Sequence, residues 1–360
     1  MNKRIVSFLL AAAMMVQPIA ANAVDFEPVE KEKLVVIPET AQSIITSYDM
    51  GDVVETHELY GADDEVVATC LDFEDAYLIY LNNGTVIEFS DIDNSDYYGL
   101  NEKTYYGGPL SYYKEDNDSI IELSTGMEIN ESTLLLQTET LNEIALDSNC
   151  ISVNSLSGNV NETQVLTPEA HKLSLPYSLN TSYHFNNDNE YYDSCVAHSM
   201  AILIDYYNKR ISQDYIPSEY DSSERKFFKY IINTYFTGKD TYHRTREELV
   251  EIMTSYCTDH NLKNSVYSVE SSENSLYSET YYSIGCIKRP IILYLKHSDI
   301  LQYAYEWNID HAVVVHGVSD PAFYSQNHYA YFYVNDGWGH NNKAILYNEL
   351  YMDSVTRFKK

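Results

Sequence analysis

Residues 193–210, DSCVAHSMAILIDYYNKR, constrain the fold more than any other part of the sequence. Residues 196–204 are mostly apolar on every side, which predicts a helix that is packed all round inside the protein. Asp193 or Ser194 can cap the start of this helix, because a side-chain oxygen there accepts a free backbone N–H. Cys195 would then lie in the first turn, where the helix dipole and the unpaired amides favour a thiolate.

The N-terminus has the features of a secretory signal peptide. A short basic start is followed by an apolar run over residues 5–16 and by Ala21-Asn22-Ala23, a pattern that signal peptidases cut after. We therefore expect residues 1–23 to be a signal peptide and the protein to be secreted. No later stretch is long and apolar enough to predict a membrane span.

Charge divides the rest of the chain into two unlike parts. Residues 24–170 contain 4 Lys and Arg against 31 Asp and Glu, whereas residues 171–360 contain 17 against 23. This asymmetry indicates two separately built units. Neither part has the basic patch that binding to nucleic acid or to an anionic membrane requires, so neither partner is expected.

The first unit is predicted to be rich in β-structure. Residues 24–48 are polar and acidic and suggest an extended arm, whereas residues 66–129 contain short β-branched and aromatic runs separated by turn signals. We expect a small antiparallel β unit with a tyrosine-rich turn at 105–113, closed by a helix over 133–146. A Ser-, Asn- and Thr-rich stretch follows, so this acidic domain is predicted to span residues 24–165.

The second unit, residues 166–360, reads as helices followed by strands. Residues 222–236 and 244–260 show helical spacing, and the latter begins with a Thr245-x-x-Glu248 capping box. After Pro290 the pattern changes to strands, among them HAVVVHGV (311–318) and HYAYFYVN (328–335). The predicted class is α+β, with a helical lobe, an antiparallel β lobe and a cleft between them.

The five cysteines leave one thiol unpaired in an oxidising compartment, as expected if Cys195 is kept for chemistry. The other four allow three pairings. Cys70 with Cys150 and Cys257 with Cys286 would keep the two units separable, whereas crossed pairing would tether them.

The strongest functional signal is the order of Cys195, His311 and Asn335 along the chain. Pairing the two strands with His311 opposite Asn335 makes them equal in length and puts the imidazole beside the amide. An acceptor beside the ring fixes its tautomer, so that its other nitrogen can serve the thiol. Asp336 would then point the opposite way unless a bulge reverses the choice.

Each of these residues also has a structural interpretation. A histidine in an apolar strand is usually a hydrogen-bonded core residue, and Asn-Asp-Gly is a common turn. His316 falls on the other face of its strand, and His198, one helical turn after Cys195, is an alternative base without an evident orienting partner. The ordered combination is more specific than any single residue.

CVAHSMAILIDYY, HAVVVHGV and VNDGWG resemble the nucleophile helix, base strand and Asn–Trp segment of the papain-like cysteine peptidases, most closely the streptopain-like bacterial branch. The similarity covers about residues 185–345. It implies Cys195 as nucleophile, His311 as general base and acid, and Asn335 as orienting residue. Two further roles are implied by position: Asn189 stands where the family has the oxyanion-hole glutamine, and Trp338 would shield the His–Asn pair. Asp336 departs from the aromatic residue of that branch.

The resemblance also implies a function for the whole chain. It predicts a secreted endopeptidase, made as a zymogen in which residues 24–165 form an inhibitory or fold-assisting prodomain, and acting on protein or peptide substrates. No cofactor or metal is expected, since the histidines lack ligand spacing such as H-E-x-x-H. A thiol acyltransferase, a cell-wall amidase or a non-catalytic surface-binding protein on the same scaffold are the alternatives, and a permanent adhesion or carbohydrate-binding domain is the alternative for residues 24–165.

Overall fold

The computed structural model describes residues 36–117, 119–124, 126–146, 172–175, 179, 194–211, 214–237, 245–270, 275–295, 311–319, 330–337, 341–348 and 350–359. The fold is a mixed α+β arrangement of one large, mostly antiparallel sheet and six helices within these residues. The predicted signal peptide lies outside them. No described helix is both long and apolar enough to cross a membrane.

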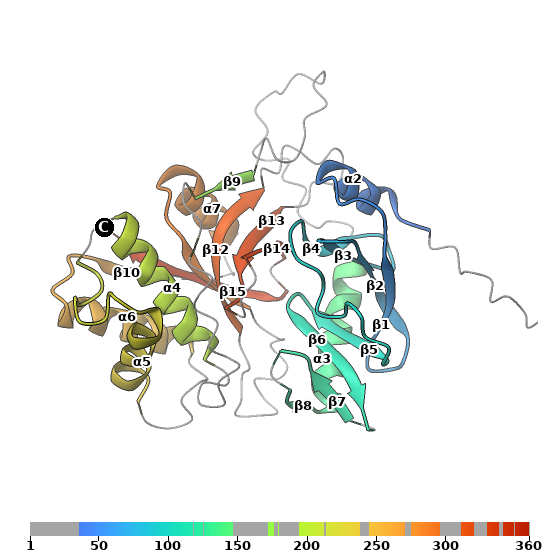
Figure 1. Cartoon of the computed structure of the whole chain (residues 1–360), viewed down its shortest axis with the longest axis horizontal. Helices are drawn as coiled ribbons and strands as arrows, with labels where there is room; N and C mark the ends of the chain where they lie inside the picture. Colours follow the sequence, from blue (N-terminus) through green and yellow to red (C-terminus); the bar gives the residue numbers. More distant parts are fainter. Residues whose placement is uncertain are drawn as a thin grey trace, which may run out of the picture. The chain divides into compact units, whose positions relative to one another are not determined.

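The N-terminal half is mainly β-structure between two helices (Figure 1). Helix α2 (Glu39–Ser47) opens it and helix α3 (Glu131–Leu146) closes it, as predicted for α3. The predicted extended arm is wrong at α2, because Ala41, Ile44 and Ile45 give this segment a buried helical face. The strands are β1 (Glu55–Tyr60), β2 (Val66–Asp72), β3 (Tyr77–Leu81), β4 (Val86–Ser90), β5 (Thr104–Gly108), β6 (Ser111–Asp116), β7 (Ser119–Glu122) and β8 (Glu128–Ile129).

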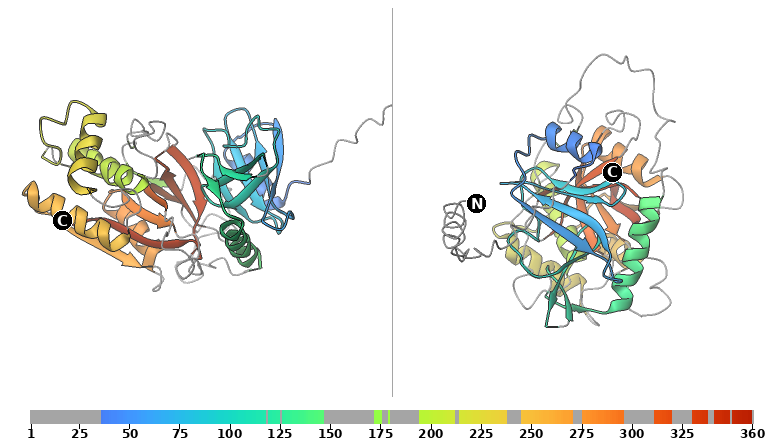
Figure 2. Two further views of the ribbon diagram at one scale, coloured as in Figure 1. Left: turned by 90° about the horizontal axis from the view of Figure 1, so that it is seen from below. Right: turned by 90° about the vertical axis from the view of Figure 1, so that its right-hand side faces the viewer.

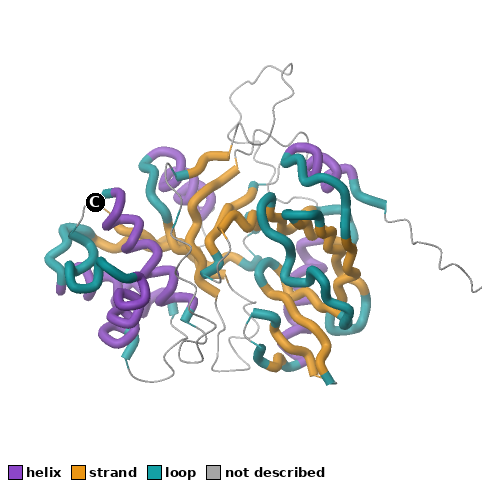
Figure 3. Tube along the Cα trace, viewed as in Figure 1, coloured by secondary structure: helices purple, strands orange, loops and turns teal. Residues whose placement is uncertain are grey.

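The C-terminal half contains four helices and a turn of π-helix beside a sheet, within the described residues. Figure 3 shows its helices grouped beside the strands. The helices are α4 (Cys195–Arg210), α5 (Glu224–Tyr235), α6 (Arg246–Asp259) and α7 (Ser275–Tyr281), with a π-helical turn η3 (Tyr282–Cys286). The strands are β9 (Lys172–Ser174), β10 (Ser265–Glu270), β11 (Ile291–Leu295), β12 (His311–Ser319), β13 (Tyr331–Asn335), β14 (Asn341–Leu346) and β15 (Met352–Lys359).

The helix predictions in this half are confirmed. Helix α4 buries every side chain from Val196 to Asn208, as its all-round apolar pattern predicts. Helix α6 begins with the complete Thr245–Glu248 capping box, in which each side chain accepts a hydrogen bond from the other residue's backbone. Both features follow from local sequence alone.

The sheet continues from one half of the chain into the other. The strand order is β10-β15-β11-β12-β13-β14-β4-β3-β2-β1-β5-β6-β7-β8, and β9 pairs with β12. All pairs are antiparallel except β1 with β5. The two halves join where β14 pairs with β4 (Figure 2). In this pairing Ala344 lies opposite Phe89. The ring of Phe89 then packs edge-on against Tyr331 and Tyr333 of β13.

The sequence left three pairings of the cysteines open. Cys70, Cys257 and Cys286 are free thiols, so none of these pairings forms in this structure. Cys70 is fully buried in β2 and its thiol contacts Asp72, whereas Cys286 is exposed at the end of the π-helical turn. Cys150 lies outside the described residues.

Candidate active site

Cys195 is the first residue of α4 and is half-buried. Ser194 occupies the N-cap position, but its side chain makes no capping hydrogen bond, so the predicted side-chain cap is wrong for Ser194. The Ser194 hydroxyl instead contacts Nδ1 of His198 at 2.9 Å. Asp193 lies outside the described residues. Because Cys195 begins α4, its thiol lies in the first turn, where the backbone amides and the helix dipole favour a negative charge.

Helix α4 is fastened to the beginning of β12 by one buried hydrogen bond. The Ser199 hydroxyl donates to the carbonyl oxygen of Ala312 at 2.8 Å. Ser199 lies one helical turn after Cys195, and residues four apart share a helix face. Ala312 directly follows His311, the first residue of β12. This contact brings the Cys195 end of α4 beside the His311 end of β12.

The turn after β13 also lies against α4. A Cβ atom at Gly337 would stand 3.6 Å from the Cβ atom of His198. Gly337 has φ +78°, a left-handed conformation that glycine adopts without steric cost. The start of α4, the start of β12 and the end of β13 therefore converge, and they are the three segments that the sequence motif connects.

The predicted register of β12 with β13 is wrong. Asn335 pairs with Val314, three residues from His311, and Val315 pairs with Val334. The ladder is also irregular between Val315 and Gly317, where β12 contains a bulge. The prediction assumed two regular strands of equal length, whereas the bulge and the actual strand ends set the pairing.

A three-residue slip exchanges the faces of the sheet. His311 shares the parity of Val313 and Val315, whereas Asn335 shares the face of Val314. Strand alternation returns Asp336 to the face of His311. The sequence analysis expected Asn335 on the face of His311, whereas the observed register puts Asp336 on that face.

An ion pair supports this placement of Asp336. Lys343 of β14 lies opposite Val334, which is two residues before Asp336 and so on the same face. The Nζ atom of Lys343 approaches Oδ2 of Asp336 at 3.4 Å, and both side chains are 0% exposed.

Asn335 is engaged in the turn that follows its strand. Its Oδ1 atom accepts a hydrogen bond from the backbone N–H of Gly337 at 2.9 Å, and the residue is buried. Such side-chain to backbone bonds two residues ahead are typical of asparagine in turns. This contact gives Asn335 a structural role in the bend that carries Asp336.

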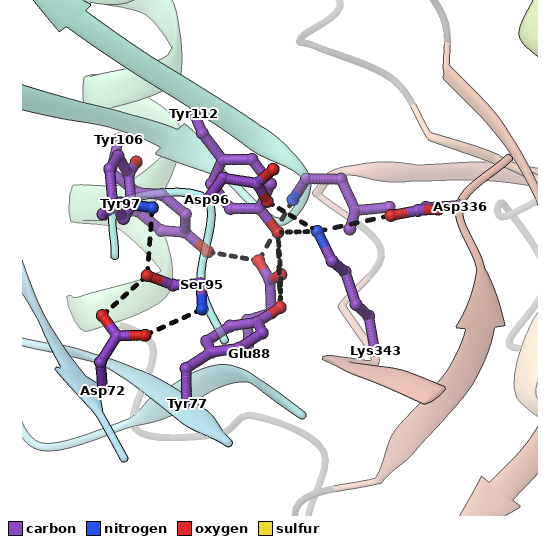
Figure 4. Close-up of polar contacts among 11 residues, drawn as sticks. Asp72, Tyr77, Glu88, Ser95, Asp96, Tyr97, Tyr106, Tyr112, Asp336 and Lys343 are labelled. Carbon is purple, nitrogen blue, oxygen red and sulfur yellow. Dashed lines mark hydrogen bonds and ion pairs between the residues drawn. The ribbon is translucent and has the colours of Figure 1, made fainter. Parts of the chain in front are cut away.

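Lys343 connects Asp336 to the N-terminal half (Figure 4). Its Nζ atom donates to Asp96 at 2.8 Å and to the Tyr112 hydroxyl at 3.2 Å. Burial alone would lower the pKa of Lys343, but Asp96, Asp336 and Glu88 together raise it above its ordinary value. Lys343 is therefore a buried permanent cation.

His198, the alternative base, has structural contacts of its own. Its ring packs on Phe228 of α5 with the centroids 4.1 Å apart, and the side chain is fully buried. Its Nδ1 atom lies 2.9 Å from both the hydroxyl and the carbonyl oxygen of Ser194. These contacts hold the first turn of α4 against α5.

Two predicted site residues, Asn189 and Trp338, lie outside the described residues. The sequence interpretation missed Ser199, Gly337 and Lys343. A lysine inside the apolar run KAILYN was a signal for a buried cation, whereas Ser199 looks like any small residue of a buried helix.

Among the described residues no group of three or more His, Cys, Asp or Glu side chains is arranged to hold a metal ion. No protein-family model matches the sequence, and no curated protein matches it significantly.

Proposed function

We propose that this chain is a secreted cysteine endopeptidase with a papain-like two-lobed catalytic domain. The observation that carries the proposal is the hydrogen bond from Ser199 to Ala312, which joins the helix turn of Cys195 to the strand end of His311. The contact of Gly337 with α4 adds the segment that holds the orienting residue. The predicted signal peptide supports secretion.

In this proposal the Cys195 thiolate attacks the carbonyl carbon of a peptide bond. The backbone N–H of Cys195, with Asn189, would stabilise the oxyanion. The imidazolium of His311 transfers its proton to the leaving amine, and a thioester remains on the sulfur. Water then attacks the thioester and gives its proton to His311, and the C–S bond breaks to release the acid.

We further propose that Asp336 orients His311. Asp336 lies on the His311 face of the sheet in the observed register, whereas the family resemblance favours Asn335. A carboxylate suits this role because it accepts the ring N–H and stabilises the imidazolium that forms during the reaction. The Asn335 amide oxygen bonds to Gly337, which fits a supporting role.

The N-terminal half is proposed to be a prosegment that assists folding. Its support is the pairing of β4 with β14 and the packing of Phe89 on Tyr331. These contacts complete the edge of the proposed catalytic sheet and cover its aromatic residues.

Replacing Cys195 with alanine tests the nucleophile. We expect casein hydrolysis under reducing conditions to fall to background, because the covalent step is lost. Cys286→Ala is the matched control, since this exposed thiol lies in η3 and should leave hydrolysis unchanged. Unchanged hydrolysis by the Cys195→Ala protein would contradict the proposal. An added amine acceptor that yields an isopeptide product would favour the acyltransferase alternative.

The same variant tests the zymogen. Mass spectrometry of the wild-type secreted protein should show a product beginning between about residues 147 and 175, and the Cys195→Ala protein should lack it. An identical cleavage pattern in both proteins would argue against self-processing.

A further inference from the structure

Lys343 is surrounded by acidic and phenolic groups from both halves of the chain. They are Asp336 after β13, Glu88 in β4, Asp96 after β4, and Tyr112 of β6. Lys343 is 0% exposed, so water screens its charge only weakly from these groups. A change at one of them therefore alters the field at the others.

Asp96 is the contact through which the N-terminal half holds this cation. Its carboxylate lies 2.8 Å from Nζ of Lys343, closer than that of Asp336 at 3.4 Å. The shorter distance means that Asp96 neutralises a large share of the lysine charge. What remains acts on Asp336, which lies on the His311 face of the sheet.

From this geometry we infer that Lys343 is a positioning residue through which Asp96 of the N-terminal half controls the orienting carboxylate Asp336. The inference rests on the proposed function, because it deepens the account of the same site. Lys343 holds one carboxylate oxygen of Asp336. Its positive charge also weakens the stabilisation that Asp336 gives to the His311 imidazolium. Asp96 limits this weakening, because it neutralises part of the lysine charge. The N-terminal half is thus part of the electrostatic setting of the site.

The test compares two Asp→Asn variants of the secreted protein with both halves present, since a cut between residues 147 and 175 does not itself break the pairing of β4 with β14. Asp96→Asn removes the acid that faces Lys343, whereas Asp64→Asn removes an exposed acid that pairs with Lys103 in the same half. Both lose one charge from the same strongly acidic region, so a general charge effect would act on them equally. Asp96→Glu restores a carboxylate and serves as the rescue variant.

Two readouts are measured from about pH 4 to 10. The first is kcat and KM for a peptide substrate. The second is the rate of Cys195 alkylation by iodoacetamide, with the labelled cysteine identified by mass spectrometry, which requires no peptidase activity. A thiolate is a stronger nucleophile once its cationic neighbour loses its proton, so the alkaline step of this rate reports on His311.

Asp96→Asn leaves Lys343 less neutralised beside Asp336. The imidazolium of His311 should therefore lose its proton at lower pH, with the alkaline limb of both profiles shifted down by on the order of one pH unit. We expect kcat of Asp96→Asn to fall several-fold with KM unchanged. Asp64→Asn should match the wild type, and Asp96→Glu should return both profiles most of the way to those of the wild type.

Profiles of Asp96→Asn that superimpose on the wild type would overturn the inference while the peptidase proposal stands. Equal shifts in Asp96→Asn and Asp64→Asn would overturn it as well, because they would reflect overall charge. A wild type without hydrolysis, combined with an alkylation shift in Asp96→Asn alone, would refute the peptidase proposal and support the coupling.

Discussion

Glu88 in the N-terminal half and Asp336 in the C-terminal half are both buried carboxylates near Lys343, but their surroundings differ. Glu88 accepts hydrogen bonds from the hydroxyls of Tyr77, Tyr106 and Tyr112 and from the backbone N–H of Leu110. Asp336 lies at the end of a strand, in contact with a cation and beside the candidate site. A carboxylate surrounded by hydroxyl and amide donors serves the fold, whereas one at the meeting point of α4, β12 and β13 lies where the proposed mechanism needs a charge.

The first prediction from this comparison concerns Asp336, where we expect the largest effect. Asp336→Asn should lower kcat per folded molecule by about 10²- to 10⁴-fold, because the imidazolium loses its negative neighbour. It should also lower the unfolding free energy, because it breaks the buried ion pair with Lys343. Asn335→Ala is the matched variant next to it, and we expect a smaller loss of activity and about 1 kcal/mol of stability from its turn hydrogen bond. Initial rates and urea unfolding measure both. A larger loss of activity in Asn335→Ala would assign the orienting role to Asn335.

Glu88→Gln should show the opposite pattern. The amide cannot accept from all four donors, so we expect a loss of about 1–3 kcal/mol in unfolding free energy, with a smaller fall in kcat per folded molecule than Asp96→Asn gives. Burial raises the pKa of Glu88, so the folded state takes up a proton more readily than the unfolded state. The wild type should therefore gain stability relative to Glu88→Gln as the pH falls through the folded pKa. The exposed Glu102→Gln is the control, and a lack of any difference from it would contradict this role.

We expect the smallest effect on stability from replacing single buried tyrosines in the two halves. Burial raises the pKa of Tyr77, Tyr106 and Tyr112 well above the ordinary value, and it raises the pKa of Tyr207 on α4 to about 12. Their contribution to stability is complete below the unfolded value near 10 and is lost as the pH rises through the folded values.

Absorbance of tyrosinate during an alkaline titration tests this difference. Tyr106→Phe should remove one phenol from the fraction that ionises only on unfolding, because Tyr106 is fully buried. A loss from the fraction that ionises before unfolding would show that Tyr106 is accessible in the folded protein.

The sequence predicted those parts of the fold that depend on local pattern. The all-round apolar helix α4, the capping box of α6 and the β-branched strands all formed where their patterns indicated. Helix α2 was missed although Pro38 and Glu39 are signals of a helix start, because its buried face contains only a few apolar residues.

The candidate site was predicted in part. The motif order identified Cys195 and His311, and the structure brings their elements together. The strand register could not be predicted, because the true ends of the two strands and the one-residue bulge near His316 both depend on tertiary packing. Lys343 was missed for a related reason: its partner Asp96 is 247 residues away, and only the pairing of β14 with β4 brings them together.

That same pairing has a consequence for how the protein is made. Strand β4 leaves the ribosome long before β14, so one hydrogen-bonding edge of the acidic half has no strand to join during synthesis. An open edge can recruit a strand from another chain, and its many carboxylates would repel such neighbours until the final strands emerge. In this view the acidity of the N-terminal half protects an unfinished chain from aggregation.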